Sequence, residues 1–361
     1  MLKHMREYIE NIEDPRRGNA TFHPLESIIG IVLLSALAGI DDFVGMEDFA
    51  EAHQEALKGV LDLSRGIPSH DTIGRVLSNI DPKSFSDSFQ MFVNDLAGKV
   101  QGVVALDGKT IRRSGASPAH LVSAWSAQNR VSLAQVKVAD KSNEITAIPE
   151  VLRLFDTENT VITIDAMGCQ LDIAAQIVQQ KANYVLAIKG NQKTLFEDIK
   201  AYFSDDALRP KDPTIQWDQG HGRIESRTCY ATDDIDWLQD RHHWPHLKSI
   251  AMIMSTREEK GQLRATETRF FLSSLPADPK IIAAAVRQHW GIENTLHWSL
   301  DVVFNEDNAC VHKSNAPENL ALIRKWALNI LHQKRPKNMS IKRTMRKALL
   351  KPQFLLELCN F

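Results

Sequence analysis

Two aspartates each follow a short apolar run, and one glutamate lies far downstream in a stretch with a helical pattern. Asp107 follows Val103–Leu106, Asp165 follows Val161–Ile164, and the glutamate is Glu293. Apolar runs of this length are typical of buried strands in a central sheet. A carboxylate at the end of such a strand emerges where ligands bind in α/β proteins. Together these carboxylates could hold two divalent cations beside a phosphodiester, which predicts metal-dependent phosphoryl transfer on DNA.

Each of these carboxylates also has an ordinary structural interpretation. A strand-terminal aspartate more often stabilises a turn or caps a helix, as Asp165 could do, and Glu293 could lie on a helix surface. Asp301, Glu306 and Asp307 follow Glu293 closely and compete for the third position. Asp301 lies about two helical turns, roughly 12 Å, beyond Glu293, which is too far for both to bind one ion easily. The combination of three carboxylates in compatible positions favours the catalytic interpretation.

The residues between 103 and 188 predict the elements that would position the two aspartates. Apolar or alternating runs predict strands at 103–106, 121–127, 133–138, 161–164 and 184–188. Helices are predicted at 148–155, with Pro149 in the first turn, and at 171–180. The order β-β-β-α-β-α-β is that of a ribonuclease-H-like core, with the aspartates at the ends of its first and fourth strands.

The flanking regions have different patterns. Residues 1–98 are predicted to be helical throughout. Their most apolar stretch, Ile28–Ile40, is predicted as a buried helix because a bilayer span needs about 20 residues. Residues 195–277 are predicted as a β-rich insertion with strands at 227–231, 250–254 and 268–271. From Lys280 onward the helical pattern returns.

Composition restricts the class of protein. The chain has 361 residues, of which 43% are hydrophobic and 24% charged, so a large core is expected. The net charge of −2 gives no overall support for nucleic-acid binding, so local basic clusters at 109–113, 334–337 and 342–347 carry more weight. The four cysteines lack CxxC spacing, which argues against a disulfide framework or zinc site and fits a reducing cytoplasm. The N-terminus lacks the apolar core of a signal peptide.

Several segments resemble the H-repeat-associated proteins, a family of bacterial insertion-sequence transposases of the DDE class. The segments that carry the resemblance are Asp107–Arg112, Ile164–Gln170, Leu186–Gln192, His289–Trp298, Asp14–Gly18, Ile67–Thr72 and Lys141–Glu150. The resemblance extends over nearly the whole chain. It implies an α/β fold with a ribonuclease-H-like mixed-sheet core at 99–194 and 278–333. It also implies an all-helical N-terminal domain at 1–98 that could bind DNA ends, a β-rich insertion at 195–277 and a basic helical tail at 334–361.

The same resemblance implies an activity and its partners. It assigns Asp107, Asp165 and Glu293 as catalytic and metal-binding residues, holding two Mg²⁺ ions that Mn²⁺ could replace. The implied reaction is cleavage at the ends of an insertion sequence followed by strand transfer. The expected partners are the terminal inverted repeats of the element and target DNA. A homodimer on DNA is expected because two ends must be paired. No membrane partner is expected, and the implied location is the bacterial cytoplasm, in association with the nucleoid.

The chain departs from related groups around the glutamate. Those groups carry a tyrosine, an arginine and a lysine at set distances from it, where this chain has Val286, His289 and Leu300. Arg287 could take the place of the missing arginine.

Candidate DNA-contacting residues lie near the expected site. Cations after the first catalytic strand could neutralise phosphates, although a solvated charged loop is the alternative. Polar residues after the last core strand could contact the cleaved end, with an ordinary turn at Gly190 as the alternative. A charged segment that opens the insertion could be a DNA-contacting loop or a simple hairpin. The full set is Lys109, Arg112, Arg113, Lys189, Asn191, Gln192, Arg223, Arg287 and His289.

Two other functions stay open on the sequence. The chain could be a catalytically silent, sequence-specific DNA-binding protein, such as a self-repressor from a decayed element. It could also be a metal-dependent nuclease that cuts DNA and never joins it. An assay for strand-transfer product separates these possibilities.

Overall fold

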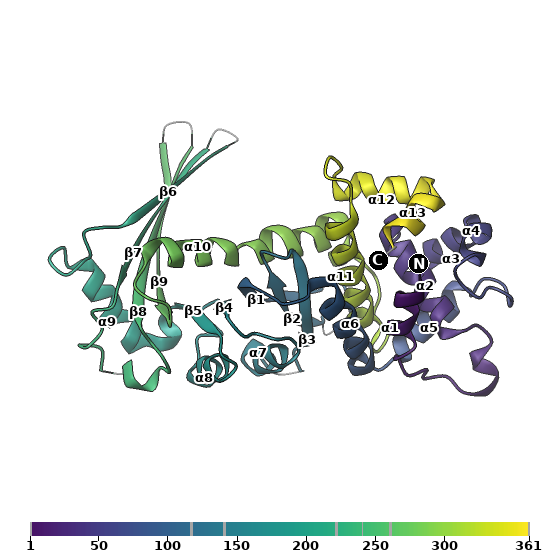
Figure 1. Cartoon of the computed structure of the whole chain (residues 1–361), viewed down its shortest axis with the longest axis horizontal. Helices are drawn as coiled ribbons and strands as arrows, with labels where there is room; N and C mark the ends of the chain where they lie inside the picture. Colours follow the sequence, from purple (N-terminus) through teal and green to yellow (C-terminus); the bar gives the residue numbers. More distant parts are fainter. Residues whose placement is uncertain are drawn as a thin grey trace.

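A mixed β-sheet extends through the protein in the computed structural model, which describes residues 2–115, 118–139, 142–220, 223–239, 241–259 and 262–359. The order of its nine described strands is β3-β2-β1-β4-β5-β9-β8-β7-β6. These strands are β1 Gly102–Thr110, β2 His120–Ser126, β3 Val131–Lys137, β4 Thr160–Ile164, β5 Asn183–Ile188, β6 Thr214–Gly220, β7 Arg223–Thr232, β8 Ser249–Glu259 and β9 Gln262–Ser273. Figure 1 shows the sheet in the middle and at one end of an elongated molecule, with a helical body at the other end.

The first five strands form the predicted ribonuclease-H-like core. β1 pairs in parallel with β4 and β4 with β5, whereas β2 runs antiparallel to both β1 and β3. The apolar side chains of Val103–Leu106 are buried, as are Ile162 and Ile164 of β4. Burial on both faces explains why these strands read as continuous apolar runs.

One boundary differs from the prediction. β1 does not end before Asp107 but continues to Thr110, because residues 107–110 still pair with β2 after β4 has ended. The pairing of β1 with β4 stops at Leu106 opposite Ile164. Asp107 therefore lies within a strand, at the point where one of the two neighbouring strands is lost.

Helices cover the two faces of the sheet unequally. α7 (Glu144–Arg153) packs on β2 and β3, and α8 (Leu171–Gln179) packs on β5, both on the lower face in Figure 1. α10 (Pro279–His289) crosses the opposite face and contacts β1, β4 and β5 as well as β7 and β8. α7 begins at Glu144 with Asn143 as its N-cap, so Pro149 lies inside the helix and not in the first turn as predicted.

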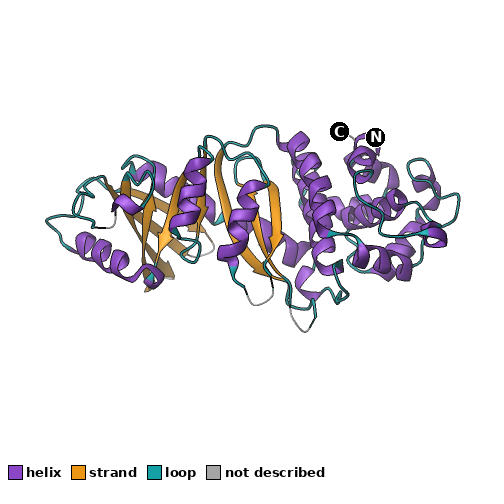
Figure 2. Ribbon diagram, turned by 90° about the horizontal axis from the view of Figure 1, so that it is seen from below, coloured by secondary structure: helices purple, strands orange, loops and turns teal. Residues whose placement is uncertain are grey.

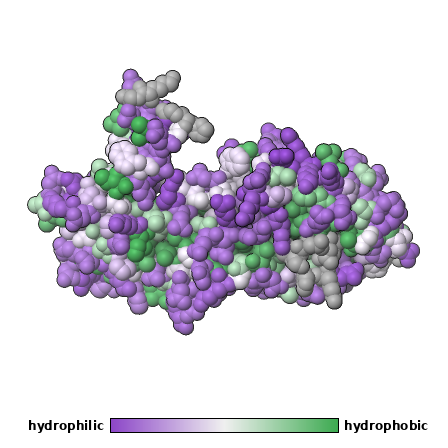
Figure 3. All heavy atoms as spheres, turned by 45° about the horizontal axis from the view of Figure 1, so that its top comes forward, coloured by the Kyte–Doolittle hydropathy of each residue, from purple (hydrophilic) through white to green (hydrophobic). Residues whose placement is uncertain are grey.

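The insertion continues the core sheet. β9 pairs antiparallel with β5, with Ala187 opposite Phe271, and β8, β7 and β6 follow in turn. The three predicted strands of this region are present but longer, and β6 was missed. The far parts of the two hairpins project from the body, and Figure 3 shows a mixed polar and apolar surface on this arm. Ile215, Trp217 and Leu263 are exposed on these strands. α9 (Lys193–Ser204) packs against β9.

The helical body is built from both ends of the chain. Its N-terminal elements are α1 Leu2–Ile9, η1 Gly18–Thr21, α2 Leu25–Ala38, α3 Phe43–Ala52, α4 Gln54–Lys58, α5 His70–Asn79 and α6 Pro82–Ala97. Its C-terminal helices are α11 Ala316–Lys334, α12 Ile341–Leu350 and α13 Pro352–Leu358. α11 packs on α2, α5 and α6 and also on β3, so it joins the helical body to the sheet (Figure 2). The two termini lie close together (Figure 1).

α2 is buried almost entirely, as predicted for Ile28–Ile40. None of the described helices is by itself long and apolar enough to cross a bilayer. Only α2 and α3 taken together reach the required length and composition, and the two are bent by 94° relative to each other.

Candidate active site

The two aspartates lie side by side at the edge of the core. Leu106 is opposite Ile164 in the last pair of the parallel β1–β4 ladder, and Asp107 and Asp165 come immediately after this pair. Parallel neighbouring strands bring their carboxyl ends to the same edge of a sheet, and this edge is where ligands bind in such folds. The positions predicted from the two apolar runs are therefore adjacent in space.

Glu293 reaches the same place from the helix that crosses the sheet. After α10 the chain continues through η4 (Ile292–His297) and η5 (Ser299–Val303), which have π-helical geometry. π-Helical turns are rare in proteins overall, but those that occur often lie at functional sites. Asp107, Asp165 and Glu293 all line one cavity of about 260 Å³. The structure thus brings the three predicted carboxylates to a common space.

Burial and neighbouring carboxylates dominate the electrostatics at Asp107. Burial raises the pKa of Asp107 to about 7, and the carboxylates of Glu144, Glu293 and Asp165 add to the rise. Burial also raises the pKa of Glu293, although nearby Arg269 opposes it. Carboxylates that repel one another in this way are stabilised by a cation.

The donor set therefore fits hard divalent ions, which prefer carboxylate oxygens. Across the described residues, no three histidine, cysteine, aspartate or glutamate side chains stand at metal-binding distance. Asp107, Asp165 and Glu293 would have to move closer together to share an ion.

Asp165 is held in place by the loop that follows it. Its Oδ1 accepts hydrogen bonds from the backbone N–H groups of Met167 (3.0 Å) and Gly168 (3.3 Å). The Asn191 amide donates to the Ala166 carbonyl (2.6 Å), and the Gln192 amide donates to the Cys169 carbonyl (3.0 Å). Asp165 therefore stabilises the turn that follows it and also lines the cavity. Asn191 and Gln192, which were predicted to contact DNA, hold the backbone behind this aspartate.

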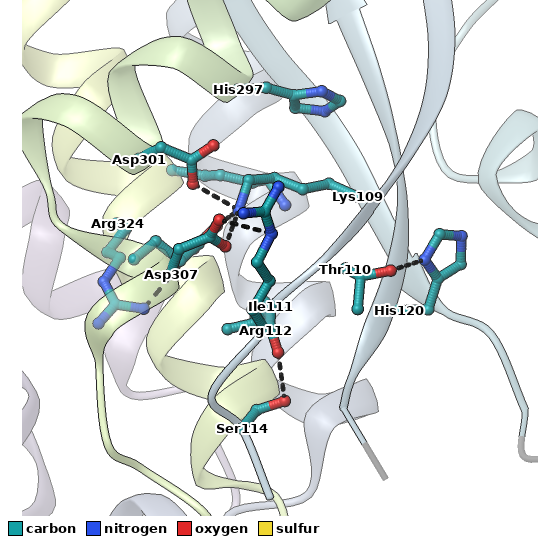
Figure 4. A network of polar contacts seen from close by, with 12 residues as sticks. Lys109, Thr110, Ile111, Arg112, Ser114, His120, His297, Asp301, Asp307 and Arg324 are labelled. Atoms are coloured by element: carbon teal, nitrogen blue, oxygen red, sulfur yellow. Dashed lines mark hydrogen bonds and ion pairs between the residues drawn. The ribbon is translucent and has the colours of Figure 1, made fainter.

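Lys109 is the centre of a network of ion pairs (Figure 4). Its Nζ lies 2.7 Å from Asp301, 2.9 Å from Glu306 and 3.2 Å from Asp307, and its side chain is only 11% exposed. Burial alone would lower the pKa of Lys109, but the carboxylates of Glu306 and Asp301 outweigh it and raise the pKa. The cation predicted to neutralise DNA phosphates is thus bound by carboxylates of the protein itself.

The same network distinguishes Glu293 from the other candidates for the third carboxylate of the site. Asp301, Glu306 and Asp307 point toward Lys109, and Glu306 also lies 3.6 Å from Arg324. Glu293 is the member of this acidic stretch that lines the cavity of the two aspartates. The geometry favours Glu293 where residue spacing alone left a choice.

Two histidines flank the carboxylates and are neutral. Burial lowers the pKa of His289 to about 4, and its Nδ1 lies 3.0 Å from Thr163 Oγ1. Burial lowers the pKa of His297 to about 3, and its Nδ1 lies 3.5 Å from Asp107 Oδ2. His289 lines the cavity as predicted, but a neutral imidazole hydrogen-bonded to β4 is poorly suited to pairing with a phosphate.

The remaining candidate cations occupy different surroundings. Lys189 is exposed and lines the carboxylate cavity. Arg112 pairs with Asp307 at 3.3 Å, and Arg113 is exposed in the same segment. Arg223 begins β7 far out on the projecting arm and pairs with Glu259 at 3.6 Å. The structure brings Lys189 to the carboxylates and leaves Arg223 distant from them.

A second cavity of about 520 Å³ extends from the site over the insertion strands. It shares Arg269 and Trp290 with the carboxylate cavity, and the Arg269 guanidinium lies 4.5 Å from the centre of the Trp290 ring. Arg287 lines it and pairs with Asp218 of β6 at 2.9 Å. Arg287, which was predicted to contact DNA, therefore faces the insertion.

Sequence reasoning missed a fourth carboxylate whose charge acts on Asp107. Glu144, at the first position of α7, is among the charges that raise the pKa of Asp107, and His120 binds Glu144. Glu144 lies within one of the segments that carried the family resemblance, but nothing in its spacing relates it to the aspartates. Only the packing of α7 on the sheet brings it there.

Comparisons with known proteins agree with this fold. Residues 98–330 match the family described as "Transposase DDE domain", and residues 6–93 match a family described as "DDE_Tnp_1-associated". The chain therefore belongs to the DDE-domain transposase family.

Several curated relatives match most of the chain. The "Putative transposase YncI" of Escherichia coli O157:H7 is 38% identical, covering 99% of this chain and 94% of the relative. The "H repeat-associated putative transposase YhhI" of Escherichia coli K12 is 36% identical, and the match covers 98% of this chain and 97% of the relative. An "Uncharacterized protein in dhlA 3'region" of Xanthobacter autotrophicus is 42% identical, and the match covers 77% of this chain and 97% of the relative.

Proposed function

We propose that this protein is an active transposase that cleaves DNA at the ends of an insertion sequence and joins the released 3′-hydroxyls to target DNA. One observation carries the proposal: Asp107, Asp165 and Glu293, which are far apart in the sequence, line a single cavity at the end of two parallel strands. The raised pKa of Asp107 supports it, because mutually repelling carboxylates at a cavity are typical of a cation site.

The three carboxylates would hold two divalent ions, Mg²⁺ or Mn²⁺. When bound, the ions lower the barrier to attack of an oxygen nucleophile on phosphorus and stabilise the departing oxygen. The contribution of the chain is positioning. The backbone N–H groups of Met167 and Gly168 fix Asp165, leaving its second oxygen for the cavity. The ion pairs of Lys109 anchor β1 just beyond Asp107 to the segment that follows Glu293.

The substrate is double-stranded DNA, namely the terminal inverted repeats of the element and the target. Lys189 at the cavity would pair with a phosphate near the cut, and Arg269 and Arg287 line a path for the strand toward the insertion. Two ends must be paired for transposition, so the DNA-bound form is proposed to be a homodimer. The reaction would take place on nucleoid DNA in the bacterial cytoplasm.

Strand cleavage of a labelled DNA end tests this function. The substrate is the DNA that borders the coding sequence on its element, incubated with the purified protein and Mg²⁺. We expect cleavage and, with a target plasmid, strand-transfer product. Asp107→Asn, Asp165→Asn and Glu293→Gln should each lose activity by more than about 100-fold, since even outer partners of a metal site are worth about 10–100-fold.

A matched control is available on the neighbouring helix. Asp172→Asn on α8 removes an exposed carboxylate that does not line the cavity and should leave the rate unchanged. Cleavage without joined product would assign a nuclease instead. Specific binding without cleavage under any divalent metal would assign a silent DNA-binding protein. Either result would overturn the proposal.

A further inference from the structure

The basic cluster at 342–347 has no role in the proposed site and lies on the exposed face of α12. Residues 334–356 contain eight lysines and arginines and no aspartate or glutamate, although the whole chain carries a net charge of −2. Lys342, Arg343 and Arg346 are exposed. Their spacings of three and four positions place them on one face of the helix. α12 therefore presents a positive surface with no acidic residue of its own.

No carboxylate from elsewhere in the described part of the chain compensates this charge. The side chains of Lys342, Arg343 and Arg346 take part in no ion pair or hydrogen bond there. Arg227 and Arg257 of the insertion, by contrast, each pair with a neighbouring glutamate. Ordinary protein surfaces mix charges of both signs, whereas a field of one sign attracts an oppositely charged partner. The exposed face of α12 thus fits an anionic partner.

The apolar side of α12 fixes the helix to the helical body. Ile341, Met345 and Ala348 are buried, and the helix packs on α2, α11 and α13. Ser340 caps the first turn, because its hydroxyl accepts a hydrogen bond from the Arg343 backbone N–H at 3.3 Å. Membrane-binding amphipathic helices bury their apolar side in lipid, but here that side is already used inside the protein. The exposed cations on a fixed helix suit the phosphate backbone of DNA better than a lipid surface.

α12 lies on the side of the molecule that also carries the segment leading to Glu293. In Figure 1 the arm of the insertion projects upward, α10 runs along the upper side of the sheet toward the helical body, and α12 lies on top of that body. Val286 and His289 of α10 line the carboxylate cavity. A duplex that follows this side from the cavity to the helical body would therefore meet α12.

From this placement we propose that the exposed face of α12 binds the phosphate backbone of the terminal DNA at a distance from the cut. The inference rests on the proposed function and adds a contact surface that is separate from the carboxylate cavity. Lys342, Arg343 and Arg346 would each neutralise one phosphate and release its counterions. Such contacts position a protein on a duplex without reading its sequence.

Fluorescence anisotropy of the full-length protein in EDTA tests the inference. The probes are a terminal-repeat duplex and a duplex of unrelated sequence, each at several salt concentrations. The variant Lys342→Gln/Arg343→Gln/Arg346→Gln should bind both duplexes more weakly and reduce the slope of log affinity against log salt by about 2–3. An unchanged slope, or a loss confined to the terminal repeat, would overturn the inference. Weaker binding to vesicles of anionic phospholipid with unchanged binding to DNA would assign α12 to a membrane surface and would also overturn it.

A matched control removes the same charge from other places on the surface. Lys58→Gln/Lys181→Gln/Lys200→Gln changes three exposed lysines that each pair with a glutamate. This control should bind DNA with the slope of the parent. If both triple variants reduced the slope equally, net charge alone would account for the effect and the inference would fail.

Two further measurements separate DNA binding from a structural role of these side chains. The melting temperature of the glutamine variant of α12 should equal or exceed that of the parent, because cations that repel one another are removed. The charge-conserving variant Lys342→Arg/Arg343→Lys/Arg346→Lys should bind DNA like the parent. A lower melting temperature of the glutamine variant, with binding lost equally in the charge-conserving one, would overturn the inference.

The same experiments distinguish failure of this inference from failure of the proposed function. If the parent neither bound nor cleaved the terminal repeat, the proposed function would fail and the inference with it. If the parent cleaved the terminal repeat and the glutamine variant of α12 kept the parent slope, only the role of α12 would be lost.

Discussion

At the residue scale, Asp107 is surrounded by like charges. Burial and the carboxylates of Glu144, Glu293 and Asp165 hold its pKa near 7, well above that of a free aspartate. In the absence of a cation, this arrangement opposes folding because the ionised carboxylate is less stable here than in water. The site is therefore expected to reduce stability in exchange for affinity for metal.

We predict that Asp107→Asn melts at a higher temperature than the parent protein in EDTA at pH 8. The shift should be a few degrees, since 1 kcal/mol moves the melting temperature of a large domain by roughly 2–4 °C. Mn²⁺ should raise the melting temperature of the parent and leave the variant unchanged. Differential scanning calorimetry measures both effects. An Asp107→Asn variant that is less stable than the parent in EDTA would show that this carboxylate is structural.

Lys109 is predicted to matter for stability and not for direct contact with DNA. Lys109→Met leaves the carboxylate of Glu306, which is 1% exposed, without its nearest cation. Breaking a buried ion pair from one side costs about 3–5 kcal/mol, and urea unfolding should show a loss of this size. Arg112→Ala is the matched control. Its side chain is 80% exposed where it pairs with Asp307, and surface pairs are worth about 0–1 kcal/mol. Equal effects of the two substitutions would contradict this account of the network.

At the element scale, α11 joins the helical body to the sheet. It packs on α2, α5 and α6 and on β3, and its Trp326 ring lies 5.0 Å from that of Phe92 on α6. Near its end, the His332 ring meets Trp125 of β2 edge-on at 5.7 Å. Burial, with the nearby charges of Arg335 and Arg130, lowers the pKa of His332 to about 4. This contact therefore requires a neutral imidazole.

The contact of α11 with β2 should weaken in acid. An unfolded histidine titrates near pH 6.5 and His332 in the fold near 4, so its contribution is complete above pH 6.5 and is lost as the pH falls toward 4. At pH 5 the protonation of His332 on unfolding should lower the free energy of unfolding of the parent by about 2 kcal/mol. The His332→Phe variant should not show this decrease. Urea unfolding of both proteins at pH 7.5 and pH 5 measures the difference. Identical pH dependence of parent and variant would show that His332 is not a buried neutral group.

Elements could be predicted from the sequence where burial dictates residue type. Most side chains of β1, β4 and β5 are buried, so their apolar runs identified these strands and placed the two aspartates. β6 lies at the edge of the sheet with most of its side chains exposed, so no apolar pattern marked Thr214–Gly220. The predicted start of α7 was too late in the sequence because proline is common in the first turn of a helix, which favoured a start near Pro149. The helix in fact begins earlier, after its N-cap Asn143.

Side-chain roles were harder to predict than positions. Lys109 looked like a phosphate ligand because the acidic residues that bind it, Asp301, Glu306 and Asp307, are distant in the sequence. His289 stands where related groups carry an arginine and was predicted to contact DNA, but its burial and its contact with Thr163 favour a neutral imidazole. Partners that meet through tertiary packing leave no local signal in the sequence.

At the scale of the whole molecule, the charge balance is slightly negative, so any affinity for DNA must come from local groups. Many arginines of the insertion pair with acidic neighbours, as Arg227 does with Asp218 and Glu225. Lys189 is an exposed cation on the cavity that contains the carboxylates. Binding to DNA should therefore depend strongly on a few cations at the site.

We predict that Lys189→Ala weakens binding to a terminal-repeat duplex and reduces the slope of log affinity against log salt by about 1. Fluorescence anisotropy at several salt concentrations measures this slope. Lys181→Ala is the control, because this exposed lysine precedes β5 at the opposite end of the strand and pairs with Glu158 at 3.3 Å. A slope that changes equally in both variants would place Lys189 outside the DNA interface.

The position of bound metal would show whether Asp107, Asp165 and Glu293 form one catalytic site. Crystals of the full-length protein with a cleaved DNA end and Mn²⁺ would locate manganese by anomalous scattering. We expect manganese peaks within bonding distance of the Asp107, Asp165 and Glu293 carboxylates and next to the 3′-terminal oxygen of the DNA. Manganese bound elsewhere, with these three carboxylates still too far apart to share an ion in the DNA complex, would contradict this expectation.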